Sequence, residues 1–356
     1  MPVASQVGGN ITAMHYGGVI LMGAGGVIDG TGAGGPASVR ALVDSVQRQR
    51  DVSVPAPMLI GVDQEYGEVA RLVHGFTRFP GASELAGGST DTAAATAVTE
   101  QIATAAAAEM RAVGISVDFA PDADVLPASG DSAIGSRSYG SDPNRVAAFV
   151  AAAVRGYQQG GVAATIKHFP GIGRIAADTH TALPTLTAGC QEWSRTEAVP
   201  MAAGARSGAA LAMTGHVHFP AVGVDDAPAS LSPRVVTDLL RGRGFSGCVG
   251  IGFHGVAVTD SMQMSPVADR YSSAEAAWRA LAAGQDLLLM PIDPVVAAQG
   301  IITAVKDGSL RPARLADAAT TVLALRLATA RSQRPSLDVV NSAAHRALAD
   351  QGRAGG

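Results

Sequence analysis

The residues best suited to chemistry in this sequence directly follow short apolar runs. Asp260 ends the run 256–259, and a carboxylate there could serve as a nucleophile, a base or a metal ligand. Lys167 and His168 close another run and precede a Pro-Gly turn. Lys167 is one of only two lysines in the chain, since arginine supplies nearly all of the positive charge. Taken alone, Asp260 could instead be a helix cap and Lys167 part of a structural ion pair.

A candidate acid/base pair lies in the loop that follows the Pro-Gly turn. Asp178 stands two residues before His180. An aspartate at this spacing can accept a hydrogen bond from the imidazole, fix its tautomer and raise its basicity. His180 is therefore the candidate proton carrier, and Asp178 is the residue that would orient it.

The remaining polar side chains at the ends of apolar runs suit a ligand with many hydroxyl groups. Asp63 offers acceptor oxygens after the run 57–62, and Arg137 lies in a glycine-flanked loop where it could clamp a hydroxyl or a carboxylate. Asp122 and His216 also follow apolar runs. The sequence has no metal-binding motif and no cysteine–histidine set, so we expect neither a metal nor another cofactor.

The strands and helices that would position these residues alternate along the chain. Such alternation predicts parallel βαβ units. Buried strands are expected at 17–22, 57–63, 116–121, 163–169, 210–216, 256–260 and 286–291. Helices are expected at 38–50, 91–113, 143–159, 194–207, 232–242, 273–283, 293–307 and 314–332.

The placement of the candidate residues favours a barrel over an open sheet. They follow separate strands, and the carboxyl ends of the strands meet at one mouth in a (β/α)8 barrel. An open doubly wound sheet would gather them near one switch point, and the glycine fingerprint of a dinucleotide site is missing. We therefore predict an α/β protein with a single TIM-type (β/α)8 barrel domain at 1–333, its first strand missing or irregular, and a polar tail at 334–356.

The composition excludes several classes of protein. Of 356 residues, 47% are hydrophobic and 16% are charged, which excludes a disordered chain. A net charge of −4 gives no signature of nucleic-acid binding, and no apolar run approaches the roughly 20 residues of a membrane span. Cys190 and Cys248 have neither metal nor redox spacing, so we expect unpaired thiols. Residues 1–10 do not resemble a secretory signal, which predicts a cytoplasmic chain as written and an exported one if the N-terminus is truncated.

Together the motifs resemble the bacterial β-N-acetylhexosaminidases of glycoside hydrolase family 3, from about residue 17 to about residue 326. The resemblance rests on Gly61-Val62-Asp63-Gln64-Glu65, Asp118-Phe119-Ala120-Pro121, Arg137-Ser138-Tyr139-Gly140-Ser141-Asp142-Pro143, Lys167-His168-Phe169-Pro170-Gly171, Asp178-Thr179-His180, Ser230-Leu231-Ser232-Pro233 and Val258-Thr259-Asp260-Ser261-Met262.

The resemblance implies a retaining exo-β-N-acetylglucosaminidase that acts on glycans or cell-wall fragments without a metal or organic cofactor. A retaining glycosidase needs a carboxylate that forms the glycosyl-enzyme and a second group that first donates and then accepts a proton. By motif, Asp260 matches the nucleophile, and His180 with Asp178 matches the acid/base dyad. The positions that match sugar-binding residues are Asp63, Arg137, Lys167 and His168. We expect a monomer whose partner is a small carbohydrate.

Four positions depart from the family pattern. Tyr66 and Glu68 replace a glycine and an arginine of D-Q-E-G-G-R-V. Ser136 replaces an aspartate, and Ile172 replaces the second histidine of K-H-F-P-G-H-G. These changes could reshape the sugar pocket or lower activity, so a catalytically impaired sugar-binding homologue is one alternative. A phosphorylase that uses the same dyad, or a β-glucosidase-like hydrolase, is the other.

A tandem duplication precedes the nucleophile. The segment 244–251 is followed by a similar segment, 252–259. Only the second copy leads directly to Asp260, so we predict the strand there and place the first copy in a loop.

Overall fold

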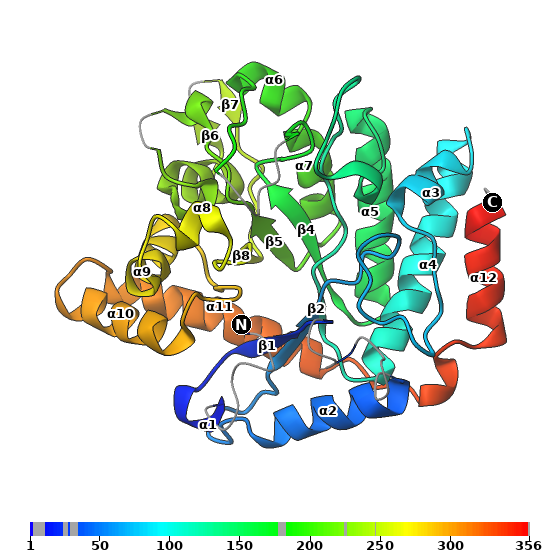
Figure 1. The fold of residues 1–356 in the computed structure, drawn as a ribbon, viewed down its shortest axis with the longest axis horizontal. Helices are drawn as coiled ribbons and strands as arrows, with labels where there is room; N and C mark the ends of the chain where they lie inside the picture. The colour runs from blue at the N-terminus through cyan, green and yellow to red at the C-terminus, as the bar shows by residue number, and fades with distance from the viewer. Residues whose placement is uncertain are drawn as a thin grey trace.

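A curled parallel sheet wrapped by helices forms the centre of the molecule in the computed structural model (Figure 1). The structure describes residues 1–2, 11–23, 28, 35–176, 183–223, 226–245 and 247–354. The expected alternation of parallel strands and helices is confirmed. No helix among the described residues is long and apolar enough to cross a lipid bilayer.

Six parallel strands make up the sheet, in the spatial order β1-β2-β3-β4-β5-β8. Every strand residue is buried, which explains why the strands appear in the sequence as continuous apolar runs rather than as alternating ones. The strands are β1 (Gly18–Leu21), β2 (Leu59–Val62), β3 (Val117–Asp118), β4 (Ala163–Phe169), β5 (Leu211–Thr214) and β8 (Val256–Thr259).

The expectation of a TIM-type (β/α)8 barrel is confirmed in part: the fold is TIM-barrel-like, but the described strands form a curled half-barrel of six strands rather than a closed ring of eight. Between β8 and β1, Leu287 forms a single parallel bridge to Val258. The N–H of Met290 then donates to the carbonyl of Met1 at 2.8 Å. The segment expected as a strand at 286–291 is limited to this bridge, since its backbone bends at residues 286 and 289 and Met290 has a left-handed φ of 44°.

Residues 1–2 join this segment to the first strand of the sheet. The N–H of Ile20 in β1 donates to the carbonyl of Pro2 at 3.0 Å, and the amino group of Met1 donates to the carbonyl of Leu288. Backbone hydrogen bonds rather than a full strand therefore span the interval between β8 and β1.

Helices cover the outer face of the sheet. Aspartates cap three of them, since Asp91, Asp142 and Asp293 each accept hydrogen bonds from two N–H groups of the first turn. The longer helices are α2 (Pro36–Arg48), α4 (Thr92–Ala112), α5 (Pro143–Gln159), α7 (Ala198–Arg206), α9 (Ser273–Ala283), α10 (Pro294–Lys306) and α11 (Pro312–Ala330). Shorter ones are α1 (Ile11–Met14), α3 (Ala82–Gly87), α6 (Cys190–Arg195) and α8 (Ser265–Ala268), with a π-helical segment at Arg234–Arg241.

Small residues let α4 and α5 approach each other closely. A Cβ on Gly156 would lie 2.3 Å from the carbonyl oxygen of Glu100, and one on Gly160 would lie 2.3 Å from the Cβ of Ala107. The alanine-rich composition of these helices is therefore a packing requirement as well as a helix preference.

The segment expected as a polar tail contains a helix packed on the barrel. In α12 (Ala343–Ala354) the imidazole of His345 lies 2.7 Å from the buried carboxylate of Glu109 in α4. A Cβ on Gly352 would lie 2.6 Å from Ile102, so the backbone of α12 touches α4 directly. Figure 1 shows α12 beside α4. The polar pattern is that of a helix with only a narrow buried stripe.

The duplicated segment divides only partly as predicted, because its first copy, expected as a loop, contains two short strands. Its first copy forms an antiparallel hairpin of β6 (Gly244–Phe245) and β7 (Cys248–Val249) outside the main sheet. The second copy forms β8. The hairpin brings Cys248 to the start of α6, where it forms a disulfide with Cys190. The expectation of unpaired thiols is therefore wrong, because residues 58 positions apart are brought together only by the tertiary fold.

Candidate active site

The carboxyl ends of the strands supply the walls of one cavity. Asp63 follows β2, Lys167 and His168 lie near the end of β4, and Asp260 follows β8. Arg137 ends a short 3-10 turn at Gly135–Arg137. All five line a cavity of about 470 Å³. The structure thus brings together every described residue that the sequence analysis proposed for the site.

Glu65 ties the cationic side chains of this cavity together. Its carboxylate receives two hydrogen bonds from Arg137, from Nε and Nη2, both at 2.8 Å. The Lys167 ammonium lies 2.5 Å from Glu65 and 3.3 Å from Asp63. This arrangement fixes both cations in the cavity wall before any ligand arrives.

The electrostatics of this group follow from burial and pairing. Burial raises the pKa of Glu65, but Lys167 and Arg137 outweigh burial and lower it to about 2. Burial also lowers the pKa of Lys167, and the charges of Glu65 and Asp63 more than reverse that, so its pKa is raised. Lys167 is therefore a charged ammonium although it is only 2% exposed.

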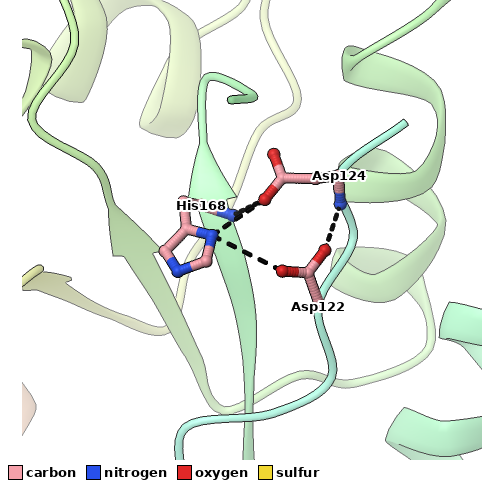
Figure 2. A group of neighbouring side chains, drawn as sticks. All are labelled: Asp122, Asp124 and His168. Carbon is pink, nitrogen blue, oxygen red and sulfur yellow. Dashed lines mark hydrogen bonds and ion pairs between the residues drawn. The ribbon is translucent and has the colours of Figure 1, made fainter. Parts of the chain in front are cut away.

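A carboxylate behind His168 fixes the orientation of its ring. Nδ1 lies 2.8 Å from Asp124 Oδ2 and 3.6 Å from Asp122 Oδ2, as Figure 2 shows. Nε2 lies 3.5 Å from Arg137 Nη2. Asp124 also accepts the N–H of Ile172 at 2.6 Å, so it holds the chain on both sides of the Pro-Gly turn.

Asp260 is held as a carboxylate in the same cavity. Burial raises its pKa, but His168, His216 and the N–H of Ser261 outweigh burial and lower it. The N–H of Ser261 donates to Asp260 at 2.7 Å. His216 lies between the Ser230 hydroxyl (2.7 Å) and the Ser261 carbonyl (2.8 Å), and burial lowers its pKa. His216 thus supports the turn that follows Asp260 through hydrogen bonds on both ring nitrogens.

Sequence reasoning missed two residues of the site. Glu65 belongs to the Asp63 motif and could accept hydrogen bonds, but the sequence does not indicate that it contacts both cations. Arg71 also lines the cavity, and its buried Nε has no hydrogen-bond partner among the described residues. Gln64 positions Arg71 by accepting its backbone N–H at 2.7 Å. The position of Arg71 in the sequence, shortly after the Asp63 motif, is the signal that could have indicated its place in the site.

The four departures from the family pattern lie in different surroundings. Ile172 is buried and lines the cavity. Glu68 and Ser136 are exposed and are not among the lining residues. Tyr66 has a left-handed φ of 64°, a conformation that favours glycine, and its ring packs edge-on against Phe79 at 5.3 Å.

Asp178 and His180 lie outside the described residues. The structure describes the chain up to Ala176 and again from Leu183. Arg174, just before the gap, lies 2.8 Å from the buried carboxylate of Glu197.

Comparison with known proteins assigns the chain to a family. The model of the glycosyl hydrolase family 3 N-terminal domain matches residues 5–325. The chain belongs to glycosyl hydrolase family 3. It is 40% identical over 214 residues to a beta-hexosaminidase of Stenotrophomonas maltophilia (strain R551-3), a match that spans 60% of this chain and 61% of that protein. It is 37% identical over 258 residues to a beta-hexosaminidase of Pseudomonas aeruginosa (strain LESB58), covering 72% of this chain and 71% of that protein.

Solved structures of similar proteins agree with the fold, and one of them is a family 3 enzyme. A β-N-acetylglucosaminidase from Paenibacillus sp. str. FPU-7 superposes with a TM-score of 0.86 at 33% identity, covering 98% of this chain and 65% of that one. A β-N-acetylhexosaminidase from Beutenbergia cavernae superposes with a TM-score of 0.73 at 33% identity, covering 91% and 93% of the two chains.

Proposed function

We propose that this protein is a retaining exo-β-N-acetylglucosaminidase that removes terminal β-linked N-acetylhexosamine from glycans. The observation that carries the proposal is the convergence of an ionised Asp260 with Asp63, Arg137, Lys167 and His168 on one cavity. The names of its family 3 relatives, beta-hexosaminidase and β-N-acetylglucosaminidase, support the same activity.

In this mechanism Asp260 attacks the anomeric carbon of the bound sugar. The lowered pKa of Asp260 keeps the carboxylate free of a proton and ready to form the glycosyl-enzyme. The bond from the anomeric carbon to the leaving oxygen breaks, and that oxygen takes a proton from His180. His180, oriented by Asp178, then accepts a proton from water as the water attacks the anomeric carbon and releases Asp260.

The paired cations give the sugar a preorganised set of hydrogen-bond partners. Glu65 holds Arg137 and Lys167 in place, and Asp124 fixes the ring of His168. Holding these groups before the substrate binds reduces the entropy lost on binding and favours a single sugar orientation.

Cell-wall fragments are the substrate class that we propose, which would make peptidoglycan recycling the biological role, with the enzyme acting as a monomer. The Cys190–Cys248 disulfide favours an oxidising compartment, and hence an exported protein over a cytoplasmic one. Trapping free thiols in protein taken directly from cells tests this, since a reduced pair would place the protein in the cytoplasm.

The activity is tested with two chromogenic substrates, a β-N-acetylglucosaminide and a β-glucoside. We expect the first to be hydrolysed faster, with the β-anomer of the sugar as the first product seen by NMR, and the Asp260→Ala variant to be inactive. The rate is measured in phosphate and in a buffer without phosphate. Faster turnover in phosphate with a sugar phosphate as product would identify a phosphorylase, and no turnover of either glycoside would indicate an impaired homologue.

A further inference from the structure

Three metal-ligating side chains form a buried group directly behind the sugar cavity. Asp122, Asp124 and His168 each offer one ligand atom, and these atoms all lie within 4.8 Å of one another (Figure 2). The residues are 2%, 1% and 5% exposed, respectively. They come from two segments, since Asp122 and Asp124 follow β3 while His168 belongs to β4.

Among the described residues, one oxygen of this group has no hydrogen-bond partner. Asp122 Oδ1 accepts the N–H of Asp124 at 2.8 Å. Asp122 Oδ2 has no hydrogen-bond partner among the described residues, although it is fully buried. It faces His168 Nδ1 at 3.6 Å and lies 3.8 Å from Arg137 Nη2. A buried carboxylate oxygen left without a partner is costly, which makes it a signal of a missing ligand.

The neighbouring cations do not supply that ligand. Arg137 directs Nε and Nη2 to Glu65 at 2.8 Å, and Lys167 lies 2.5 Å from Glu65 and 3.3 Å from Asp63. Among the described side chains, only His168 and Arg137 bring a cationic or imidazole nitrogen near these carboxylates, whose other partners are the backbone N–H groups of Asp124, His168 and Ile172. A metal cation at this point would lie within reach of both carboxylates and the imidazole.

We propose that Asp122, Asp124 and His168 bind a divalent transition-metal ion of the zinc class, and that the bound ion inhibits the enzyme. Two carboxylate oxygens with one imidazole nitrogen suit zinc, cobalt or nickel, whereas magnesium and calcium prefer oxygen ligands alone. The ion bonds to the lone pair of His168 Nδ1 and releases the proton that this nitrogen shares with Asp124. His168 lines the cavity, which gives the ion a path from solvent.

The ion would inhibit through His168 and Arg137. With the metal on Nδ1, the proton of the neutral imidazole is on Nε2, which faces Arg137 Nη2 at 3.5 Å. Two N–H donors then face each other, so His168 or Arg137 must move away from its position in the sugar-binding wall. This inhibition rests on the proposed glycosidase function, whereas binding of the ion does not.

Metal binding is tested on the full-length protein stripped with a chelator. Titration with Co²⁺ should produce visible d–d absorption bands that saturate at one ion per chain, and calorimetry with Zn²⁺ should give the same stoichiometry. Asp122→Asn keeps the size of the side chain and the Oδ1 acceptor while removing the charge, and it should weaken binding by about tenfold or more. Asp51→Asn is the matched control, because the carboxylate of Asp51 also contacts a histidine, His15 at 2.7 Å, but on the surface. This variant should bind the metal ion as tightly as the wild type.

The outcomes separate the ion site from the enzyme's function. The site is overturned if wild type and Asp122→Asn bind the metal ion equally well, or if the wild type shows no absorption band at millimolar Co²⁺. The second result is obtained with the wild type alone, so it does not depend on whether the variant folds. With a chromogenic N-acetylglucosaminide, Zn²⁺ should raise KM several-fold for wild type and not for Asp122→Asn. A KM unaffected by saturating Zn²⁺ overturns the inhibition. A protein inactive on every glycoside refutes the proposed function and leaves the binding result to decide the site.

Discussion

The two walls of the cavity are held by different forces. The charged wall consists of Asp63, Glu65, Arg137, Lys167 and His168, joined by ion pairs and hydrogen bonds. The part of the lining that we call the methionine wall consists of Asp260, Met264, Leu289 and Met290, and the polar Ser261 and Gln263 line the cavity beside Asp260.

The difference assigns rigidity to one side of the site and adaptability to the other. Buried ion pairs fix geometry but destabilise the fold strongly when one partner is lost. Methionine is flexible and tolerates replacement by residues of similar volume. The charged wall is therefore suited to holding one sugar ring, whereas the methionine wall can adjust around the reacting carbon.

The largest effect is expected from the carboxylate of the methionine wall. Asp260→Ala removes the nucleophile, so kcat should fall by about 10⁴-fold or more while KM changes little. Steady-state kinetics with an aryl N-acetylglucosaminide measure both constants. Asp269→Ala, an exposed aspartate after α8, is the control and should keep wild-type turnover. Near-normal turnover of Asp260→Ala would mean that Asp260 has only a structural role as a helix cap.

The next largest effect is expected for the proton carrier, which follows the charged wall in sequence. His180→Ala should lower the rate on poor leaving groups by about 10²–10⁴-fold and the rate on activated aryl glycosides much less, since these leave without protonation. Asp178→Asn should give a weaker form of the same pattern. An equal loss on both kinds of substrate would exclude His180 as the proton donor and direct attention to Glu65 or Glu68.

Stability should respond most to the centre of the charged wall. Glu65→Gln leaves Lys167 and Arg137 buried without their shared counter-charge, which should cost about 3–5 kcal/mol in the free energy of unfolding. Urea denaturation followed by circular dichroism measures this. Glu68→Gln, exposed on the same loop, is the control and should change the free energy by less than about 0.5 kcal/mol. Similar values for the two variants would show that the wall is not held by this ion pair.

The same residue predicts how stability depends on pH. The pKa of Glu65 is lowered from 4.5 to about 2 in the folded protein. Its ionised form therefore stabilises the fold fully above pH 4.5, and this contribution is lost as the pH falls from 4.5 towards 2. Thermal unfolding across this range should show a shallower loss of stability for Glu65→Gln than for wild type. Parallel curves would mean that another carboxyl dominates acid unfolding.

The sequence alone predicts which residues line the charged wall better than it predicts the contacts that hold them in place. Asp63, Lys167, His168 and Asp260 could be grouped because the carboxyl ends of parallel strands meet at one face. The role of Glu65 could not, since it depends on the distance between two side chains that follow different strands. The Cys190–Cys248 pair depends in the same way on where the β6–β7 hairpin lies.

The sheet shows the same limit. Apolar runs predicted the strands β1–β5 and β8, because burial on both faces leaves a continuous signal. The run at 286–291 carries that signal too, yet the segment forms one bridge and Met290 is left-handed. Backbone conformation, which an apolar run does not specify, therefore limits how far this segment pairs with its neighbours.

The smallest effect is expected from a pair of near-isosteric changes, one on each wall. Met264→Leu conserves volume on the methionine wall and should cost less than about 1.5 kcal/mol, with kcat/KM within about tenfold of wild type. Lys167→Met also preserves side-chain length, but it removes a buried charge that lies 2.5 Å from Glu65, so it should cost clearly more and raise KM. Urea denaturation and steady-state kinetics on both variants make the comparison. Equal costs would mean that the methionine wall is specified as tightly as the charged wall, and that the contrast between fixed and adaptable sides of the cavity is wrong.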